Sequence, residues 1–244
     1  MTDFLNRVIT EQLQKKNIST IVQIGANDGR INDPIYGVVN RFRERTRILL
    51  IEPQSELIPY LRENYLMHPS AVICNVAIGP SNKLTLYRVK PSLFDVFIRR
   101  HLKDSPAYRV PSGFTSAIKQ HVYDHTRGNL PLSESLEEAI ESIDVPCFEL
   151  SPIINQLGWQ AFELDFLQID TEGMDDLVIR SCNIDLLKPA LINFEHCHLP
   201  EARALTIGLW LSNMGYSLYR WCSSDTLAVR EGYQSSIIKE LQSL

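Results

Sequence analysis

The sequence has few cysteines, and none is placed as a metal or disulfide site would require. There are five in 244 residues, an odd and widely spaced set without a C-x-x-C pair. This pattern argues against a zinc site, a redox motif and a disulfide framework. We therefore expect five reduced thiols, as in a cytoplasmic protein.

Long apolar runs are also absent from the beginning of the sequence. The first ten residues include Asp3, Asn6 and Arg7 and have no extended apolar centre. They resemble neither a signal peptide nor a membrane-spanning segment. We expect a cytoplasmic protein with no membrane partner.

An excess of positive charge is the third feature that is missing. The formal net charge is −5, whereas a surface that binds phosphate backbones needs clustered, uncompensated Lys and Arg. Nucleic acid is therefore not an expected partner. Hydrophobic residues make up 44% of the chain, which can supply the core of one α/β domain or of a domain with a large insertion.

The chain contains an alternation of apolar runs and amphipathic stretches. Buried strands that alternate with helices predict a mostly parallel sheet with helices on both faces. The last two runs are joined by a short polar connection, which suits an antiparallel hairpin at the sheet edge. Helices are expected over about 2–16 and 56–65, and strands at about 20–24, 47–51, 71–76, 162–170, 190–195, 216–221 and 226–230.

The alternation is interrupted between about residues 88 and 145. This stretch is rich in His, Arg, Pro and Ser, and it contains Pro91, Pro106, Pro111 and Pro131. We interpret it as a helical insertion or lid over the end of the sheet, and not as a further sheet element. The predicted organisation is one domain over residues 1–244, with 88–145 as an inserted segment that binds substrate.

Residues at strand ends are the candidates for a functional site, because ligands of an open parallel sheet lie beyond the carboxyl ends of its strands. The first strand leads into Gly25 and Gly29, which let the backbone approach a ligand closely. The second strand ends in Glu52, whose two oxygens can accept hydrogen bonds from both ribose hydroxyls. The third ends near Asn75, an amide suited to an adenine edge. This layout predicts a nucleoside-cofactor site.

The fourth and fifth predicted strands end in carboxylates and imidazoles. Asp170 and Glu172 follow the fourth strand, and Glu195, His196 and His198 follow the fifth. Adjacent strands lie about 4.8 Å apart, so these groups are expected to converge on one pocket. A histidine beside a carboxylate can act as a general base near neutral pH. The same groups could bind a divalent ion, but no tight ligand motif is present and no metal site is assigned.

The strand-end segments together match a known family. Segments 24–29, 51–53, 75–79, 169–173 and 189–195 occur in the expected order, and from about 18 to 230 the chain resembles the FkbM family of S-adenosylmethionine-dependent methyltransferases. The resemblance implies a class I methyltransferase fold, which is a Rossmann-like, mostly parallel seven-stranded sheet with an antiparallel edge hairpin. It also implies S-adenosylmethionine as the cofactor.

The resemblance further implies roles for single residues. Gly25, Asn27 and Gly29 would wrap the methionine part of the cofactor, Glu52 would bind its ribose, and Asn75 would lie at its adenine. Gln23 stands where the family usually has an aspartate, so a charge expected near the cofactor's amino group is absent and weaker affinity is expected. The full predicted cofactor set is Gln23, Gly25, Ala26, Asn27, Gly29, Glu52, Pro53, Asn75, Val76, Ala77 and Asp170.

The acceptor side is predicted from the remaining strand-end residues. Methyl transfer is an in-line displacement that depends mainly on alignment, and a base assists a hydroxyl nucleophile. We predict that Asp170 and His196 face the acceptor, with Glu195 orienting the imidazole. Residues 113–116 loosely resemble a family segment that includes a serine near the site. The predicted substrate contacts are Ser116, Glu172 and His198.

The leading functional hypothesis is O-methylation of a sugar, polyketide or other secondary metabolite. N-methylation of a peptide side-chain amide is the close alternative, and the sequence does not separate the two. An NAD-dependent oxidoreductase would need G-x-G-x-x-G, but position 27 is Asn. A catalytically silent nucleoside-binding module fits Gln23 but predicts no convergent acids. The expected partner is a small-molecule, glycan or peptide acceptor, and a homodimer stays open.

Overall fold

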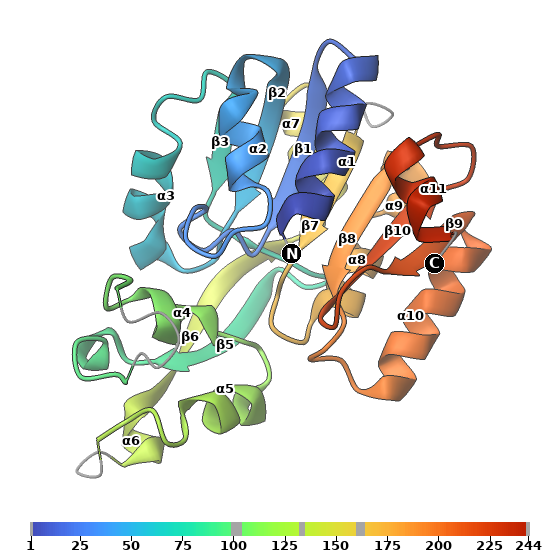
Figure 1. The fold of residues 1–244 in the computed structure, drawn as a ribbon. Helices are drawn as coiled ribbons and strands as arrows, with labels where there is room; N and C mark the ends of the chain where they lie inside the picture. Colours follow the sequence, from blue (N-terminus) through green and yellow to red (C-terminus); the bar gives the residue numbers. More distant parts are fainter. Residues whose placement is uncertain (1, 99–103, 132–134, 160–163, 243–244) are drawn as a thin grey trace.

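Seven strands form the central layer of the computed structural model, which describes residues 2–98, 104–131, 135–159 and 164–242 (Figure 1). The strand order is β3-β2-β1-β7-β8-β10-β9. Five strands are parallel, and β10 runs antiparallel to both β8 and β9. The predicted sheet with its antiparallel edge hairpin is confirmed. The strands are β1 (Ser19–Ile24), β2 (Thr46–Ile51), β3 (Ala71–Cys74), β7 (Leu164–Ile169), β8 (Leu191–Glu195), β9 (Tyr216–Arg220) and β10 (Asp225–Arg230).

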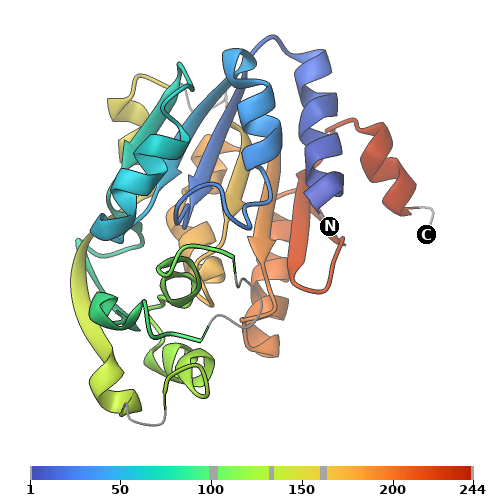
Figure 2. The same ribbon diagram turned by 60° about the vertical axis from the view of Figure 1, so that its left-hand side comes forward.

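Helices cover both faces of this sheet, and each face has its own apolar core (Figures 1 and 2). Ile21 and Val22 are neighbours in β1 but pack in different cores, because successive side chains of a strand point to opposite faces. One face carries α1 (Thr2–Lys15), α2 (Tyr36–Arg41), α3 (Ile58–Asn64) and α11 (Ser236–Gln242). The other carries α7 (Leu150–Gln156), α8 (Asp175–Ser181), α9 (Ile184–Leu187) and α10 (Glu201–Asn213).

A second, three-stranded sheet extends from the first. Its order is β4-β6-β5, with β4 (Ala77–Ile78) parallel and β5 (Lys83–Val89) antiparallel to β6 (Ile140–Phe148). The sequence predicted helices and no further sheet element over 88–145. This is wrong at both ends of the stretch, because β5 runs to Val89 and β6 begins at Ile140, and the two strands pair there. The structure places η3 (Pro91–Leu93), α4 (Arg109–Gly113), α5 (Lys119–Thr126) and α6 (Leu136–Ala139) there, between the paired strands β5 and β6. Residues 99–103 and 132–134 of this segment lie outside the described residues.

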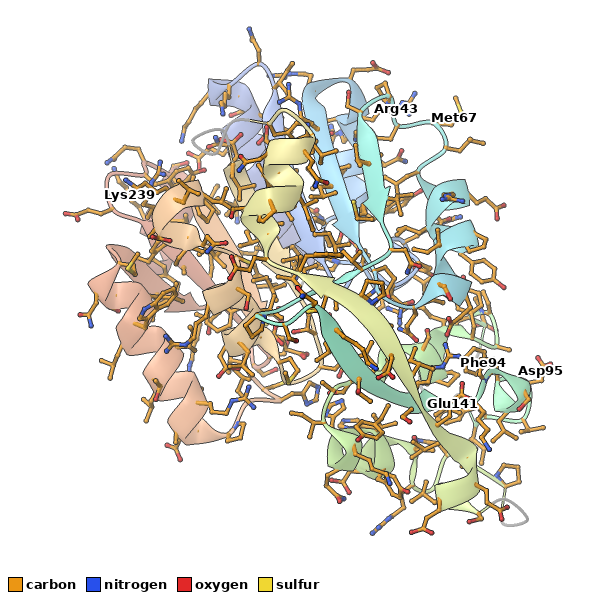
Figure 3. All side chains as sticks on the ribbon, turned by 180° about the vertical axis from the view of Figure 1, so that it is seen from behind. Arg43, Met67, Phe94, Asp95, Glu141 and Lys239 are labelled. Atoms are coloured by element: carbon orange, nitrogen blue, oxygen red, sulfur yellow. The ribbon has the colours of Figure 1, made fainter. Side chains whose placement is uncertain are left out.

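The inserted segment between β5 and β6 lies beyond the carboxyl ends of the parallel strands (Figures 1 and 2). The view from behind shows β6 crossing from the main sheet towards this segment, where Phe94, Asp95 and Glu141 project (Figure 3). Arg43, in η1 (Arg43–Arg45), and Met67 project at the opposite end of the molecule. The ribbon of β5 and β6 therefore carries the inserted segment to the end of the sheet where ligands are expected.

The structure also bears on the cysteines and on membrane insertion. All five cysteines lie among the described residues and are free thiols. In the ranges that the structure describes, no helix has both the length and the apolar character needed to cross a bilayer.

Candidate active site

The turn after β1 is fixed by its backbone. The N–H groups of Gly25 and Ala26 both donate to the carbonyl oxygen of Ile51, at 3.0 and 3.1 Å. Gly25 has φ +79°, and a Cβ at this position would overlap the carbonyl oxygen of Asp170. Only glycine fits such a conformation and such a close approach. The turn is thereby held between the ends of β2 and β7.

Glu52, which follows β2, completes this turn. Its Oε2 accepts a hydrogen bond from the Asn27 N–H at 2.7 Å, and its Oε1 accepts one from the Gln54 N–H at 2.9 Å. Each oxygen retains a lone pair for a further donor, such as a ligand hydroxyl. Burial raises the pKa of Glu52 to about 7, although both hydrogen bonds oppose the shift. We call residues 25–29 together with Glu52 the cradle.

A cavity opens beside the cradle and contains about 1130 Å³ of space free of atoms, part of it open to solvent. Asn75 does not point its amide nitrogen here, because that nitrogen donates to the carbonyls of Glu52 and Pro53 at 2.8 and 3.0 Å. Gly29 lies behind the turn, against Leu61. The predicted cofactor residues that line the cavity are Gln23, Gly25, Ala26, Asn27, Glu52, Pro53, Val76, Ala77 and Asp170.

Gln23 and Asp33 meet at one wall of the cavity. The Gln23 Nε2 donates to Asp33 Oδ2 at 2.5 Å, and both residues line the cavity. The buried Oε1 of Gln23 has no hydrogen-bond partner in the described part of the chain. A buried acceptor without a partner is costly unless a ligand supplies the donor. Asp33 therefore brings a carboxyl group to the place where the sequence predicted a missing charge, and both groups fit an amino-bearing cofactor.

The inserted segment packs onto the cradle through residues that the sequence did not single out. Asn27 Nδ2 donates to Ser112 Oγ at 3.2 Å, and Gln54 Nε2 donates to the Ser112 carbonyl at 3.1 Å. Thr115 Oγ1 donates to Gln54 Oε1 at 2.7 Å. Ser112, Thr115 and Arg109 also line the cavity. These contacts join positions 58 to 85 residues apart, so no local sequence pattern could reveal them.

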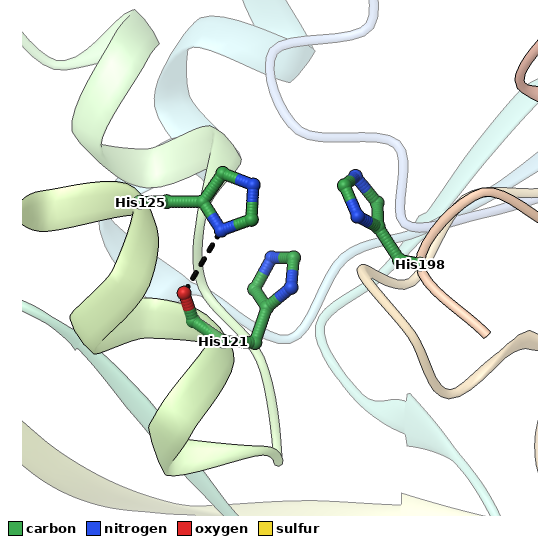
Figure 4. A group of neighbouring side chains, drawn as sticks. All are labelled: His121, His125 and His198. Atoms are coloured by element: carbon green, nitrogen blue, oxygen red, sulfur yellow. Dashed lines mark hydrogen bonds between the residues drawn. The ribbon is translucent and has the colours of Figure 1, made fainter. Parts of the chain in front are cut away.

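Three imidazoles and two carboxylates gather at the other side of the site, and we call them the histidine–carboxylate cluster: His121, His125, His198, Glu172 and Glu195. His121 and His125 belong to α5, Glu172 follows β7, and Glu195 ends β8. The Nε2 of His121 lies 2.9 Å from Glu172 Oε2, and the Nε2 of His198 lies 3.5 Å from the same oxygen. Figure 4 shows the three imidazoles facing one another.

His196 and His198 point to different surroundings. The Nδ1 of His196 lies 3.1 Å from Thr226 Oγ1, and its backbone N–H donates to the Ser224 carbonyl. The Nε2 of His198 lies 3.6 Å from Glu195 Oε2. The structure therefore brings Glu195 beside His198, whereas the sequence predicted His196 as its partner and as the imidazole at the acceptor.

The carboxyl groups of this region raise one another's pKa values. Burial, followed by the charges of Asp170 and Glu172, raises the pKa of Glu195 to about 10. Burial and the charge of Asp170 also raise the pKa of Glu172, against the opposing charge of Arg109. Desolvation at the wall of the cavity, with a smaller contribution from Asp225, raises the pKa of Asp170 to about 6. Asp170 is thus the most readily ionised of these three groups.

Ser116, a predicted substrate contact, binds the neighbouring backbone. Its buried Oγ donates to the Glu172 carbonyl at 2.7 Å and accepts from the Ile118 N–H at 3.0 Å. Its own N–H and carbonyl pair with Tyr87 of β5. Ser116 also lines the cavity, as does Glu172. These contacts fix the turn that carries Glu172 against the inserted segment.

One family model matches most of this chain. The family model described as the methyltransferase FkbM domain matches residues 23–218. A solved FkbM methyltransferase from Methylobacillus flagellatus KT is 15% identical, with a TM-score of 0.49 over 88% of this chain but only 44% of that one. Precorrin-6y C5,15-methyltransferase from Geobacter metallireducens GS-15 is 11% identical, with a TM-score of 0.42 over 93% of this chain and 87% of that one. No curated protein sequence gives a significant match.

Proposed function

Because this chain belongs to the FkbM family of methyltransferases, we propose that it methylates a hydroxyl oxygen of a sugar, a polyketide or another secondary metabolite. Its cofactor is S-adenosylmethionine. The main support for the proposal is the position of Asp170, which lines the same cavity as Gly25 and Glu52. Its pKa is raised to about 6. A carboxyl group of this strength is ionised at neutral pH and can accept a hydroxyl proton.

We assign the cofactor to the cavity beside the cradle. Bound S-adenosylmethionine supplies a methyl group attached to a positively charged sulfur. Glu52 would accept hydrogen bonds from the ribose hydroxyls with the lone pairs that Asn27 and Gln54 leave over. Gln23 Oε1 and the Asp33 carboxyl group would accept hydrogen bonds from the amino group. These three side chains thus provide the polar contacts for the cofactor before any ligand binds.

The acceptor would lie between Asp170 and the histidine–carboxylate cluster. Alignment of the acceptor oxygen supplies much of the rate in such a displacement, and Asp170 takes up the proton that the oxygen loses. Ser116 holds the turn of Glu172 in place through its hydrogen bond to the Glu172 carbonyl. Ser112, packed on Asn27, lines the cavity on the side of the inserted segment.

A hydroxyl suits this base better than an amide does. A hydroxyl oxygen attacks with a free lone pair while its proton leaves, so a carboxylate in hydrogen-bond reach is sufficient. The lone pair of an amide nitrogen is delocalised into the carbonyl group, so the amide must lose its proton more completely before it attacks. Asp170, with a pKa of about 6, is therefore better suited to a hydroxyl acceptor.

The test is methyl transfer from S-adenosyl-L-[methyl-³H]methionine to hydroxylated sugars, polyketide alcohols and peptides with Asn or Gln, with the methylated atom located by NMR. We expect transfer to a hydroxyl oxygen. Asp170→Asn should lower kcat about 100-fold or more with an unchanged cofactor Kd. Asp124→Asn, an exposed acid on α5, is the matched control. Transfer to an amide nitrogen, or full activity of Asp170→Asn, would contradict the proposal.

A further inference from the structure

The histidine–carboxylate cluster contains five side chains that could bind a metal ion, whereas a general base needs only one. One ring nitrogen from each of His121, His125 and His198 lies within 4.8 Å of one ring nitrogen from each of the other two. The ring centroids are 4.1 Å apart for His121 and His125, 4.7 Å for His121 and His198, and 5.2 Å for His125 and His198. His121 and His125 are four residues apart in α5, a spacing that places two imidazoles on one helix face for metal binding. Three imidazoles therefore converge from two separate elements (Figure 4).

One of these imidazoles is already oriented as metal ligands usually are. The Nδ1 of His125 lies 2.9 Å from the carbonyl oxygen of His121. A carbonyl oxygen can only accept, so Nδ1 of His125 carries the hydrogen and Nε2 keeps its lone pair. Metal-bound histidines commonly donate their second N–H to a carbonyl or carboxylate, which fixes the ring. His125 thus presents a lone pair towards the other two imidazoles.

The two glutamates add oxygen atoms at ligand spacing. Glu172 Oε2 is 2.9 Å from His121 Nε2 and 3.5 Å from His198 Nε2, and Glu195 Oε2 is 3.6 Å from His198 Nε2. Ligand atoms bound at about 2.1 Å to one small cation lie roughly 3.0–3.5 Å apart. In the described ranges, Glu195 Oε2 is buried and has no hydrogen-bond partner. The separations and this unpartnered oxygen both match a shared cation.

We propose that the histidine–carboxylate cluster binds one Zn²⁺ ion. The ligands are Nε2 of His121, Nε2 of His198 and Oε2 of Glu172, with His125 and Glu195 available to complete the coordination. Imidazole nitrogen suits Zn²⁺ and similar transition metals, whereas Mg²⁺ and Ca²⁺ take oxygen ligands. A dication also offsets the negative charge of the neighbouring carboxylates. This proposal does not depend on which acceptor the enzyme methylates.

The ion would join the inserted segment to the main sheet. His121 and His125 lie in α5, between β5 and β6, whereas Glu172 and His198 follow β7 and β8. Glu172 also lines the cofactor cavity. A single ion at this place therefore ties the substrate-side segment to the catalytic end of the sheet and borders the space proposed for the acceptor.

Metal binding can be measured without methyl transfer. The full chain is stripped with EDTA, freed of EDTA and titrated with Zn²⁺ against a chromophoric chelator, and Co²⁺ is used in parallel for its visible spectrum. We expect one Zn²⁺ per chain with a Kd of about 1 µM or tighter, and much weaker binding of Mg²⁺. His121→Ala and His198→Ala should each weaken Zn²⁺ binding at least about 100-fold and change the Co²⁺ spectrum.

His196→Ala is the matched control, because His196 lies two residues from His198 but contacts Thr226. It should bind Zn²⁺ as the unchanged protein does. Glu172→Gln, which keeps the size of the side chain, gives a second ligand variant, and circular dichroism of the metal-free proteins verifies their folding. Absence of stoichiometric Zn²⁺ binding, equal affinity for Mg²⁺, or equal losses in His196→Ala and His198→Ala would overturn the site.

Discussion

The cradle and the histidine–carboxylate cluster lie at the same end of the sheet, but backbone groups form most of the first and side chains form the second. The cradle is made mainly of backbone groups that bond across adjacent strands, such as Gly25 and Ala26 to Ile51, together with the carboxyl group of Glu52. The cluster is made of side chains that meet from the inserted segment, β7 and β8, and its carboxyl groups repel one another. A backbone site is complete once the sheet forms, whereas a side-chain site can be altered one residue at a time. On the proposed function, the half assigned to the cofactor is therefore the harder one to alter by single substitutions, and the half assigned to the acceptor is the easier one.

The largest effect on cofactor affinity and stability is expected from Gly25→Ala, which changes the cradle itself. The new Cβ would overlap the Asp170 carbonyl oxygen, at a φ that only glycine adopts easily. We expect cofactor affinity to fall at least about 100-fold and the free energy of unfolding to fall by about 3 kcal/mol. Calorimetric titration and urea unfolding measure the two quantities.

Gly37→Ala is the control for that substitution. Gly37 lies in α2, and an added Cβ would meet no atom within 4 Å. We expect unchanged cofactor binding and a gain in stability of up to about 1 kcal/mol, because alanine favours the helix. Equal tolerance of alanine at positions 25 and 37 would remove the distinction between a rigid cradle and the rest of the fold.

A smaller change in cofactor affinity is expected from the titration of Glu52 with pH. With a pKa of about 7, the carboxyl group is mostly protonated at pH 6 and mostly ionised at pH 8. Ribose hydroxyls donate to the ionised form, so cofactor affinity should rise about tenfold between these pH values. Calorimetric titration at both pH values tests this, and Glu52→Gln should show a flat profile.

The stability of the cofactor-free protein should change with pH in the opposite sense. The pKa of Glu52 is higher in the folded protein than its ordinary value of 4.5, so the folded state binds the extra proton between about pH 4.5 and 7. The contribution of Glu52 to stability is therefore lost as the pH rises through this window. Glu52→Gln should lack that slope in urea unfolding, and an identical slope in both proteins would show that Glu52 does not titrate there.

The smallest effect on cofactor binding is expected from Ser116→Ala, on the cluster side. Loss of the buried hydroxyl, which bonds to Glu172 and Ile118, should cost about 1–2 kcal/mol of stability and lower methyl transfer. Cofactor Kd should stay within about twofold, since the cradle does not depend on Ser116. Ser81→Ala, at an exposed serine, is the control. A parallel loss of cofactor affinity would mean that the two halves are coupled.

The cradle could be predicted from the sequence because each of its parts follows directly from a strand. The glycines at 25 and 29 and the carboxylate at 52 stand at the ends of apolar runs, and parallel strands bring such ends together. Asp33 could not be predicted in the same way. It reaches Gln23 through a loop, and the path of that loop is decided by tertiary packing.

The cluster was predicted only in part, for a related reason. Asp170, Glu172 and Glu195 follow strands and were expected together, but the turn after β8 decides that His198 and not His196 faces Glu195. The spacing of His121 and His125 was a readable signal, as was the alternation of Ile143, Val145 and Cys147 in β6. Neither pattern predicts that α5 lies against the end of the main sheet, because the ribbon of β5 and β6 places it there.

The β5–β6 ribbon also has a consequence for how such enzymes diversify. Val89 and Ile140, where the inserted segment begins and ends, are paired with each other across the ribbon, so the two junctions are separated by one strand spacing of about 4.8 Å. A segment with adjoining ends can be exchanged, lengthened or shortened without shifting the main sheet. The inserted segment can therefore be replaced at the ribbon, and the end of the main sheet, where we propose the methyl-donor site, is left intact.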